Sequence, residues 1–168
     1  MSTGTGLLRP GLLAGARLAL TQFGEAGPAS ACRGELERLG ALVTETPEAG
    51  SEALIVDAAA AHGESLAPTL SETWSAVHGY AGSLIEATRP GRIVLIAPPD
   101  EAASAALENL ARTLSVEWAR RSITVVAIAR AEATSAADVA ALVAYLCSPA
   151  GEYFSGCLLD MRSGSPPG

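Results

Sequence analysis

Two kinds of segment alternate along this chain. Short runs of consecutive apolar residues are typical of strands that are buried on both faces of a sheet, whereas apolar residues at every third or fourth position are typical of amphipathic helices. The strand-like runs lie at 18–21, 41–44, 53–56, 92–96, 123–128 and 156–159. The helix-like segments lie at 28–39, 69–88, 100–120 and 135–146.

Local signals mark the ends of the expected helices. Pro28 and Gly40 flank the first one, and these are the usual places for proline in a first turn and for glycine just past a helix end. Thr69 has a glutamate three residues later, which is the spacing of a capping box. Asp100 and Ser135 are further cap candidates because their side chains can accept from free N–H groups. The pattern therefore predicts four helices with defined starts.

Apolar strands that are separated by helices predict the α/β fold class. We expect a doubly wound parallel sheet, Rossmann-like, of about six strands. The 168 residues are enough for one domain. We place this domain at 15–162, with an N-terminal tail over 1–14 and a C-terminal tail over 163–168.

Charge and hydropathy narrow the possible partners. The formal net charge is −7, the arginines are dispersed, and we expect no nucleic-acid surface. The mean hydropathy is +0.29, yet the apolar runs stay well below the ~18 residues of a membrane span. The N-terminus shows no signal-peptide pattern. We therefore expect a cytoplasmic protein with no membrane partner.

The chemistry available to the chain is limited. All eleven basic residues are arginines, so every mechanism that needs a lysine ammonium group is excluded. The three cysteines have no CxxC spacing and the two histidines have no partner at ligand spacing. We expect reduced thiols and no metal site.

From about residue 15 to 164 the chain resembles the short-chain dehydrogenase/reductase family. The strongest stretch is 105–128, AALENLARTLSVEWARRSITVVAI, which is similar to the family's helix after the catalytic lysine and the strand that follows. Segments 72–74, 91–96 and 148–156 also fit. The resemblance implies a Rossmann fold and, for an intact member, NAD(P)-dependent oxidation and reduction.

The resemblance also implies four catalytic positions, and all four are changed. The family's tyrosine falls on Asp100 and its lysine on Ser104. The serine falls on Ala97 or Pro98, and the asparagine falls near Ala81. None of these residues supplies the group that the family uses, so we assign no catalytic residue.

The cofactor loop of the family is changed as well. Its three glycine positions hold Gln22, Ala26 and Pro28, whereas Gly24 and Gly27 are out of register. In the family the amides of this turn approach a pyrophosphate at a helix N-terminus. We therefore expect no bound dinucleotide.

Two acidic residues bear on the same question. Glu25 would place a carboxylate close to the phosphates, where like charges repel. Glu45 lies about twenty residues beyond the turn, where an acidic residue would hold a ribose, although a solvated loop glutamate is the favoured interpretation. Gly24, Gly27 and Glu45 remain the weak cofactor-binding candidates.

The chain is shorter than the family pattern in the segments that surround the cofactor and the substrate in the family. Only a loop joins residue 45 to residue 54, and only a few residues follow 128 before the next helix. The long helices survive, and in the family they carry the oligomer interfaces. The interface candidates are the large apolar residues of these helices: Trp74, Leu84, Leu107, Leu114 and Trp118.

Our leading hypothesis is a non-catalytic subunit that forms oligomers with itself or with an active short-chain dehydrogenase. One alternative is an NAD(P)-dependent oxidoreductase with a divergent site that uses Asp57, His62 or Asp100. Another is a small-ligand sensor that keeps part of the nucleotide crevice.

Overall fold

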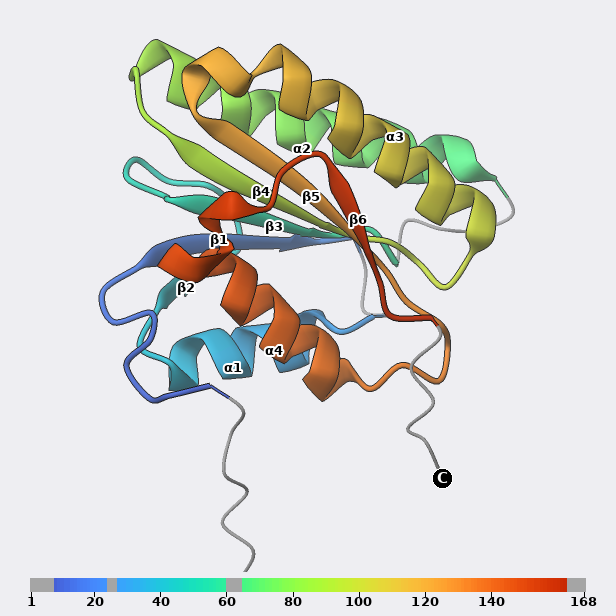
Figure 1. Ribbon diagram of the computed structural model, residues 1–168, viewed down its shortest axis with the longest axis horizontal. Coiled ribbons are helices and arrows are strands. Elements are labelled where there is room, and N and C mark those ends of the chain that lie inside the picture. Colours follow the sequence, from blue (N-terminus) through green and yellow to red (C-terminus); the bar gives the residue numbers. More distant parts are fainter. Residues whose placement is uncertain (1–7, 24–26, 60–64, 163–168) are drawn as a thin grey trace, which may run out of the picture.

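The computed structural model describes residues 8–23, 27–59 and 65–162. Its six strands form one fully parallel sheet in the order β2-β1-β3-β4-β5-β6, with helices on both faces (Figure 1). This confirms the doubly wound, Rossmann-like sheet of six strands. No helix within the described ranges is long and apolar enough to cross a membrane.

The elements follow the predicted alternation. The strands are β1 (Arg17–Gln22), β2 (Leu42–Thr44), β3 (Ala53–Asp57), β4 (Gly91–Ile96), β5 (Ile123–Ala129) and β6 (Cys157–Asp160). The helices are α1 (Ala29–Arg38), α2 (Leu66–Glu86), α3 (Glu101–Glu117) and α4 (Ala136–Cys147). The short helical turns are η2 (Ala119–Arg121) and η3 (Pro149–Tyr153).

The strand order reverses beside β1. The chain passes from β1 to β2 on one side and then crosses to β3 on the other. Gln22 pairs with Asp57, and Asp57 with Ile96, so the carboxyl ends of β1, β3 and β4 are level. In sheets of this kind ligands bind at this reversal, outside the carboxyl ends of the strands.

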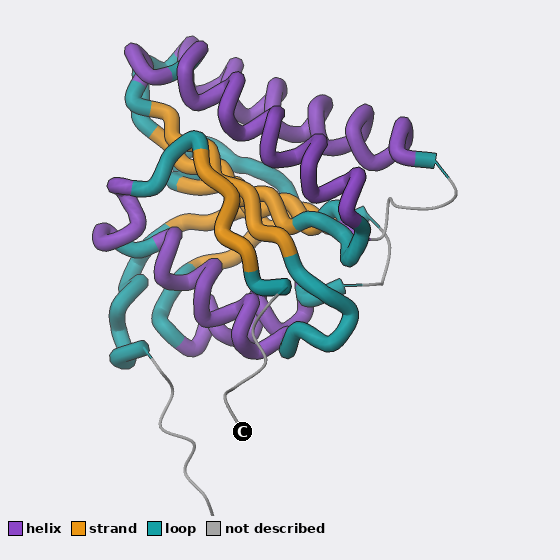
Figure 2. Tube along the Cα trace, turned by 45° about the vertical axis from the view of Figure 1, so that its right-hand side comes forward, coloured by secondary structure: helices purple, strands orange, loops and turns teal. Residues whose placement is uncertain are grey.

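Each face of the sheet has its own core. Figure 2 shows one pair of helices on either side of the strands. Ile55 of β3 packs in the cluster that contains α1 and α4, whereas its neighbours Leu54 and Val56 pack in the cluster that contains α2 and α3. Successive side chains of a strand point to opposite faces, and both faces are covered. Because both faces are buried, the strands carry apolar residues at successive positions, and the sequence shows continuous apolar runs.

Three predicted helix ends are confirmed. Gly40 has φ +99° just past α1, where the N–H of Ala41 bonds to the carbonyl of Leu36. Asp100 caps α3 by accepting from an N–H group of its first turn, and Ser135 caps α4 in the same way.

The predicted start of α2 is wrong. The helix begins at Leu66, and Ser65 is its N-cap, whose side chain accepts from the N–H of Ala67. Thr69 lies one turn inside the helix and is buried. Pro68 is tolerated because N–H groups in a first turn have no partner within the helix. In the sequence, the proline in the first turn marks the start of this helix, whereas the three-residue spacing from Thr69 to Glu72 does not.

Candidate functional site

A crevice of about 450 Å³ lies at the carboxyl edge of the sheet. The segments that follow β1, β3, β4 and β5 all contribute to its lining. Among the lining residues are Gly27, Pro28, Ala59, Pro98, Arg130 and Thr134. It lies where the strand order reverses, and this makes it the candidate ligand site.

Asp57, the last residue of β3, places its carboxylate at the first turn of α1. Oδ2 accepts a hydrogen bond from the N–H of Ala29 at 3.0 Å, and Oδ1 accepts one from the N–H of Ala59 at 3.1 Å. Gly27 has φ +113°, and a Cβ atom there would lie 2.5 Å from Oδ2 of Asp57. The chain's own carboxylate therefore occupies the N-terminus of α1, which in this kind of fold is available to anions.

Asp57 is fully buried. Burial raises the pKa of its carboxyl group, and hydrogen bonds from Ala59 and Ala29 together with the charge of Arg130 oppose that shift. Arg130 lines the crevice, and its Nε is buried without a hydrogen-bond partner among the residues that the structure describes. Arg130 and Glu132 thus line the crevice, whereas the carboxylate of Asp57 is buried against Gly27 and Ala59, which form part of the crevice wall.

The sequence resemblance places the family's four catalytic residues at positions that hold a helix cap and buried residues in this chain. Asp100 is the N-cap of α3, and its Oδ1 accepts from the N–H of Ala103 at 2.7 Å. Ser104 is 1% exposed, and its hydroxyl has no partner within the described ranges. Ala97 and Ala81 are core residues. Ala81 and Ala97 carry no group that exchanges a proton, and the hydroxyl of Ser104 is buried.

The structure describes two of the three weak cofactor-binding candidates, Gly27 and Glu45. Gly24 and Glu25 lie outside the described residues, as does His62. Gly27 faces the carboxylate of Asp57, and this contact accounts for the glycine without a nucleotide. Glu45 is exposed, and its backbone carbonyl accepts from the hydroxyl of Thr21.

Four of the five interface candidates are core residues. Leu84, Leu107, Leu114 and Trp118 are at most 6% exposed, and all four pack in the core that contains α2 and α3. Their helical spacing reflects the side that faces the sheet, so they present no surface to a partner. Trp74 is 43% exposed, so its side chain has surface that a partner could contact.

The outer side of α2 is uncharged over most of its length. The helix carries no Asp, Glu or Arg between Glu72 and Glu86. Trp74 and His78 are exposed, and their rings lie 5.1 Å apart. Exposed Gly79 follows them, and a Cβ added to it would meet no atom of the chain within 4 Å. The chain's own packing therefore does not require this glycine.

Two of the three cysteines, Cys32 and Cys147, are buried, whereas Cys157 is partly exposed. Burial raises the pKa of Cys32 and that of Cys147 to about 12, so both thiols are neutral near pH 7. Within the described ranges no three His, Cys, Asp or Glu residues gather into a group that could hold a metal ion.

The sequence pointed to part of this site only. The hypothesis of a divergent oxidoreductase names Asp57 as a candidate catalytic residue, but the contact of Asp57 with α1 depends on Ala29, which is 28 positions earlier. Arg130 was missed, although a single arginine directly after the apolar run of β5 was a usable signal.

Comparison with solved structures identifies the fold. No family model matches the chain, and no curated protein matches it. A hydroxysteroid dehydrogenase from Escherichia coli aligns with a TM-score of 0.69 and 15% identity, over 92% of this chain and 99% of that chain. A doubly substituted short-chain dehydrogenase/reductase from Serratia marcescens aligns with a TM-score of 0.64 and 20% identity, over 90% and 98%. BdcA from Escherichia coli aligns with a TM-score of 0.59 and 20% identity, over 90% and 100%. This chain has the fold of the short-chain dehydrogenase/reductase structures.

Proposed function

We propose that this chain is a non-catalytic subunit with a short-chain dehydrogenase/reductase fold, which acts by forming an oligomer. The observation that carries the proposal is the carboxylate of Asp57 at the N-terminus of α1. This position would otherwise receive the pyrophosphate of a dinucleotide.

Asp57 opposes nucleotide binding in two ways. The N–H of Ala29 already has an acceptor, so it is not available to a phosphate oxygen. An ionised carboxylate at ~4 Å from a phosphate would add about 1 to 4 kcal/mol of repulsion, depending on exposure. A protonated carboxyl group would still fill the same space. The side chain therefore blocks the usual pose in either protonation state.

The second part of the proposal concerns association, and it rests on α2. A solvated helix face normally carries charged residues, whereas the centres of interfaces are poor in charge and rich in aromatic residues. The outer side of α2 has Trp74 and His78 exposed and lacks Asp, Glu and Arg from 73 to 85. Gly79 costs helix stability and gives nothing to the chain's own packing. A closely packed partner helix would account for all three features.

The partner that we propose is a second copy or an active short-chain dehydrogenase. The family resemblance supports this choice, because the corresponding helices carry the oligomer interfaces of the family. A non-catalytic subunit of this kind would support the fold or the substrate access of the active subunit without supplying hydride chemistry.

A second candidate function is that of a small-anion sensor. The buried Nε of Arg130 has no partner among the described residues, and it lies beside a crevice of about 450 Å³. Acetate and pyruvate are suitable probes. Their binding should be saturable in the wild type and weaker in R130Q if this function holds.

Two experiments test the association. In sedimentation velocity, the purified chain should form a dimer or larger species as its concentration rises, or it should do so when an active dehydrogenase from the same host is added. A tagged chain that is recovered from that host should bring this dehydrogenase with it. A chain that stays monomeric in both conditions and recovers no dehydrogenase would overturn the proposal.

A further inference from the structure

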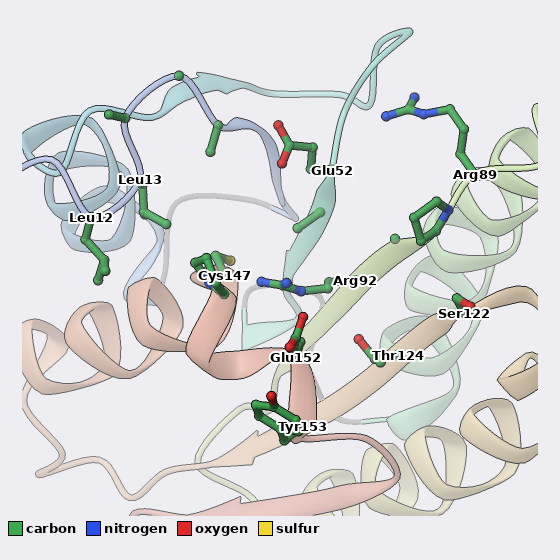
Figure 3. Close-up of a pocket in the computed structure, with 17 residues that line it drawn as sticks. Leu12, Leu13, Glu52, Arg89, Arg92, Ser122, Thr124, Cys147, Glu152 and Tyr153 are labelled. Atoms are coloured by element: carbon green, nitrogen blue, oxygen red, sulfur yellow. The ribbon is translucent and has the colours of Figure 1, made fainter.

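A second cavity, of about 830 Å³, opens at the amino edge of the sheet, opposite the crevice described above. Its lining comes from the turn at 12–16, from the segments at the amino ends of β3, β4 and β5, and from the end of α4 with η3 (Figure 3). Five separate parts of the chain thus converge on one space. Its volume lies within the range of small-molecule sites.

Charged side chains of both signs line this cavity. In Figure 3, Glu52 and Arg89 lie on one side of it, and Arg92 and Glu152 lie on the other. None of the four forms an ion pair within the described ranges, although five ion pairs occur elsewhere in them. Two cations and two anions therefore line one space without forming ion pairs with each other, and Glu52 also accepts a hydrogen bond from the backbone N–H of Arg17 at 3.2 Å.

Arg92 is held in place by the end of α4. Its Nη1 donates to the carbonyl of Leu146 at 3.3 Å and to the carbonyl of Ser148 at 2.5 Å. The C-terminal carbonyls of a helix carry partial negative charge and favour a guanidinium group there. The other nitrogens of Arg92 make no hydrogen bond to the described residues, so a carboxylate in the cavity can use them.

The remaining wall is largely apolar and uncharged. Leu12, Leu13 and Pro149 line the cavity, and Tyr153 stands at its rim with 84% of its surface exposed. Cys147 also lines it, and burial raises the pKa of its thiol to about 12, so it adds no charge near pH 7. A ligand would meet both charges and an apolar surface here.

We propose that this cavity binds a zwitterionic small molecule of the amino-acid or dipeptide class. The arginines would pair with its carboxylate, the glutamates with its ammonium group, and the apolar wall with its side chain. A ligand with only one charge would leave either the two arginines or the two glutamates without a partner of opposite charge. This site is at the other edge of the sheet from the crevice, and it is independent of the function proposed above.

Isothermal titration calorimetry on the full chain tests the ligand class. The zwitterionic probes are L-leucine and L-leucyl-L-leucine, and the single-charge probes are 4-methylpentanoate and 3-methylbutylamine. At least one zwitterion should bind saturably, and each single-charge probe should bind about tenfold more weakly or worse, because each loses one charge-assisted contact. Absence of zwitterion binding, or equal binding of a single-charge probe, would overturn the proposal.

Two variants locate the site. R89Q should weaken the zwitterion about tenfold but leave 3-methylbutylamine unchanged, and E152Q should weaken the zwitterion but leave 4-methylpentanoate unchanged. R120Q and E72Q are matched controls, because both residues are exposed and lie outside the cavity lining. Far-UV circular dichroism checks that each variant is folded. Wild-type affinity in both R89Q and E152Q would refute the site.

Discussion

Helices α1 and α2 pack on opposite faces of the same sheet, and their outer sides differ. The outer side of α1 carries ion pairs, with Arg38 bonded to Glu35 and Arg33 near Glu37. The outer side of α2 has no Asp, Glu or Arg from 73 to 85 and exposes an aromatic pair. Both helices bury an apolar side against the sheet. The inner sides thus define the fold, and the outer sides differ in charge, which is why we propose α2 as the helix that contacts a partner.

The two helices also differ at their N-termini. α2 is capped locally by Ser65, as most helices are. The N-terminus of α1 has no cap from the side chain of Pro28, and Asp57 accepts from it across the sheet edge. One helix end is thus closed by a residue that is distant in sequence, at the kind of helix N-terminus where Rossmann folds bind the phosphates of a nucleotide. The predictions below test this contrast.

The largest effect is expected from G79L. A leucine at this exposed position of α2 should leave the monomer folded but separate the partner helix, and association should weaken about a hundredfold. Sedimentation velocity measures the shift. G34L is the matched control, because Gly34 is also exposed in mid-helix on α1 and has no atom within 4 Å of an added Cβ. If G34L weakens association as much as G79L, the contrast between the helices is wrong.

D57A should destabilise the fold by about 2 kcal/mol, because two N–H groups lose their acceptor. Chemical denaturation measures this loss. The control is D138A, which removes an exposed carboxylate from the first turn of α4 and should cost about 0.5 kcal/mol. Equal losses in the two variants would show that the two hydrogen bonds of Asp57 stabilise the fold no more than an exposed carboxylate near a helix end does.

T73V should stabilise the fold by about 1 kcal/mol, because Thr73 is buried in α2 and its hydroxyl has no partner in the described parts of the chain. Valine keeps the branched shape and removes the desolvated group. The change appears as a higher midpoint of thermal unfolding. T113V, at an exposed position of α3, should change stability by less than about 0.5 kcal/mol. A destabilised T73V would show that the hydroxyl has a partner in solution.

The smallest expected effect is a pH dependence from Asp57. Its folded-state pKa is raised above 3.8, mainly by burial, so its contribution to stability is full below 3.8 and is lost as the pH rises through the folded value. Chemical denaturation of the wild type and of D57N, at a series of pH values that starts below 3.8 and rises from there, measures the effect. The wild type should lose more stability than D57N as the pH rises. Parallel curves would contradict the raised pKa.

The fold was predictable from the sequence because its determinants are local. The apolar run at 53–56 matches β3, and the Asp100 cap lies directly before α3. The start of α2 was missed because both Ser65 and Thr69 have side chains that can cap a helix. Pro68 distinguishes them, because it fits the first turn of a helix that Ser65 caps but would lie outside a helix that Thr69 caps.

The site was less predictable, for two physical reasons. Leu107 and Trp74 both lie at helical intervals, and spacing alone does not distinguish a side that faces the sheet from one that faces a partner. The contact of Asp57 with Ala29 joins two segments through the sheet, so no local pattern contains it. By contrast, the sequence resemblance alone places Asp100 and Ser104 at the positions where short-chain dehydrogenases have a tyrosine and a lysine.

The central claim is that the side chain of Asp57 fills the N-terminus of α1 and so excludes a dinucleotide. The most direct test is a fluorescence titration of the purified chain with NADH and with NADPH, with an active dehydrogenase of the same fold as the positive control. We predict no saturable enhancement at concentrations that saturate the control. Saturable binding of either nucleotide with micromolar affinity would contradict the account.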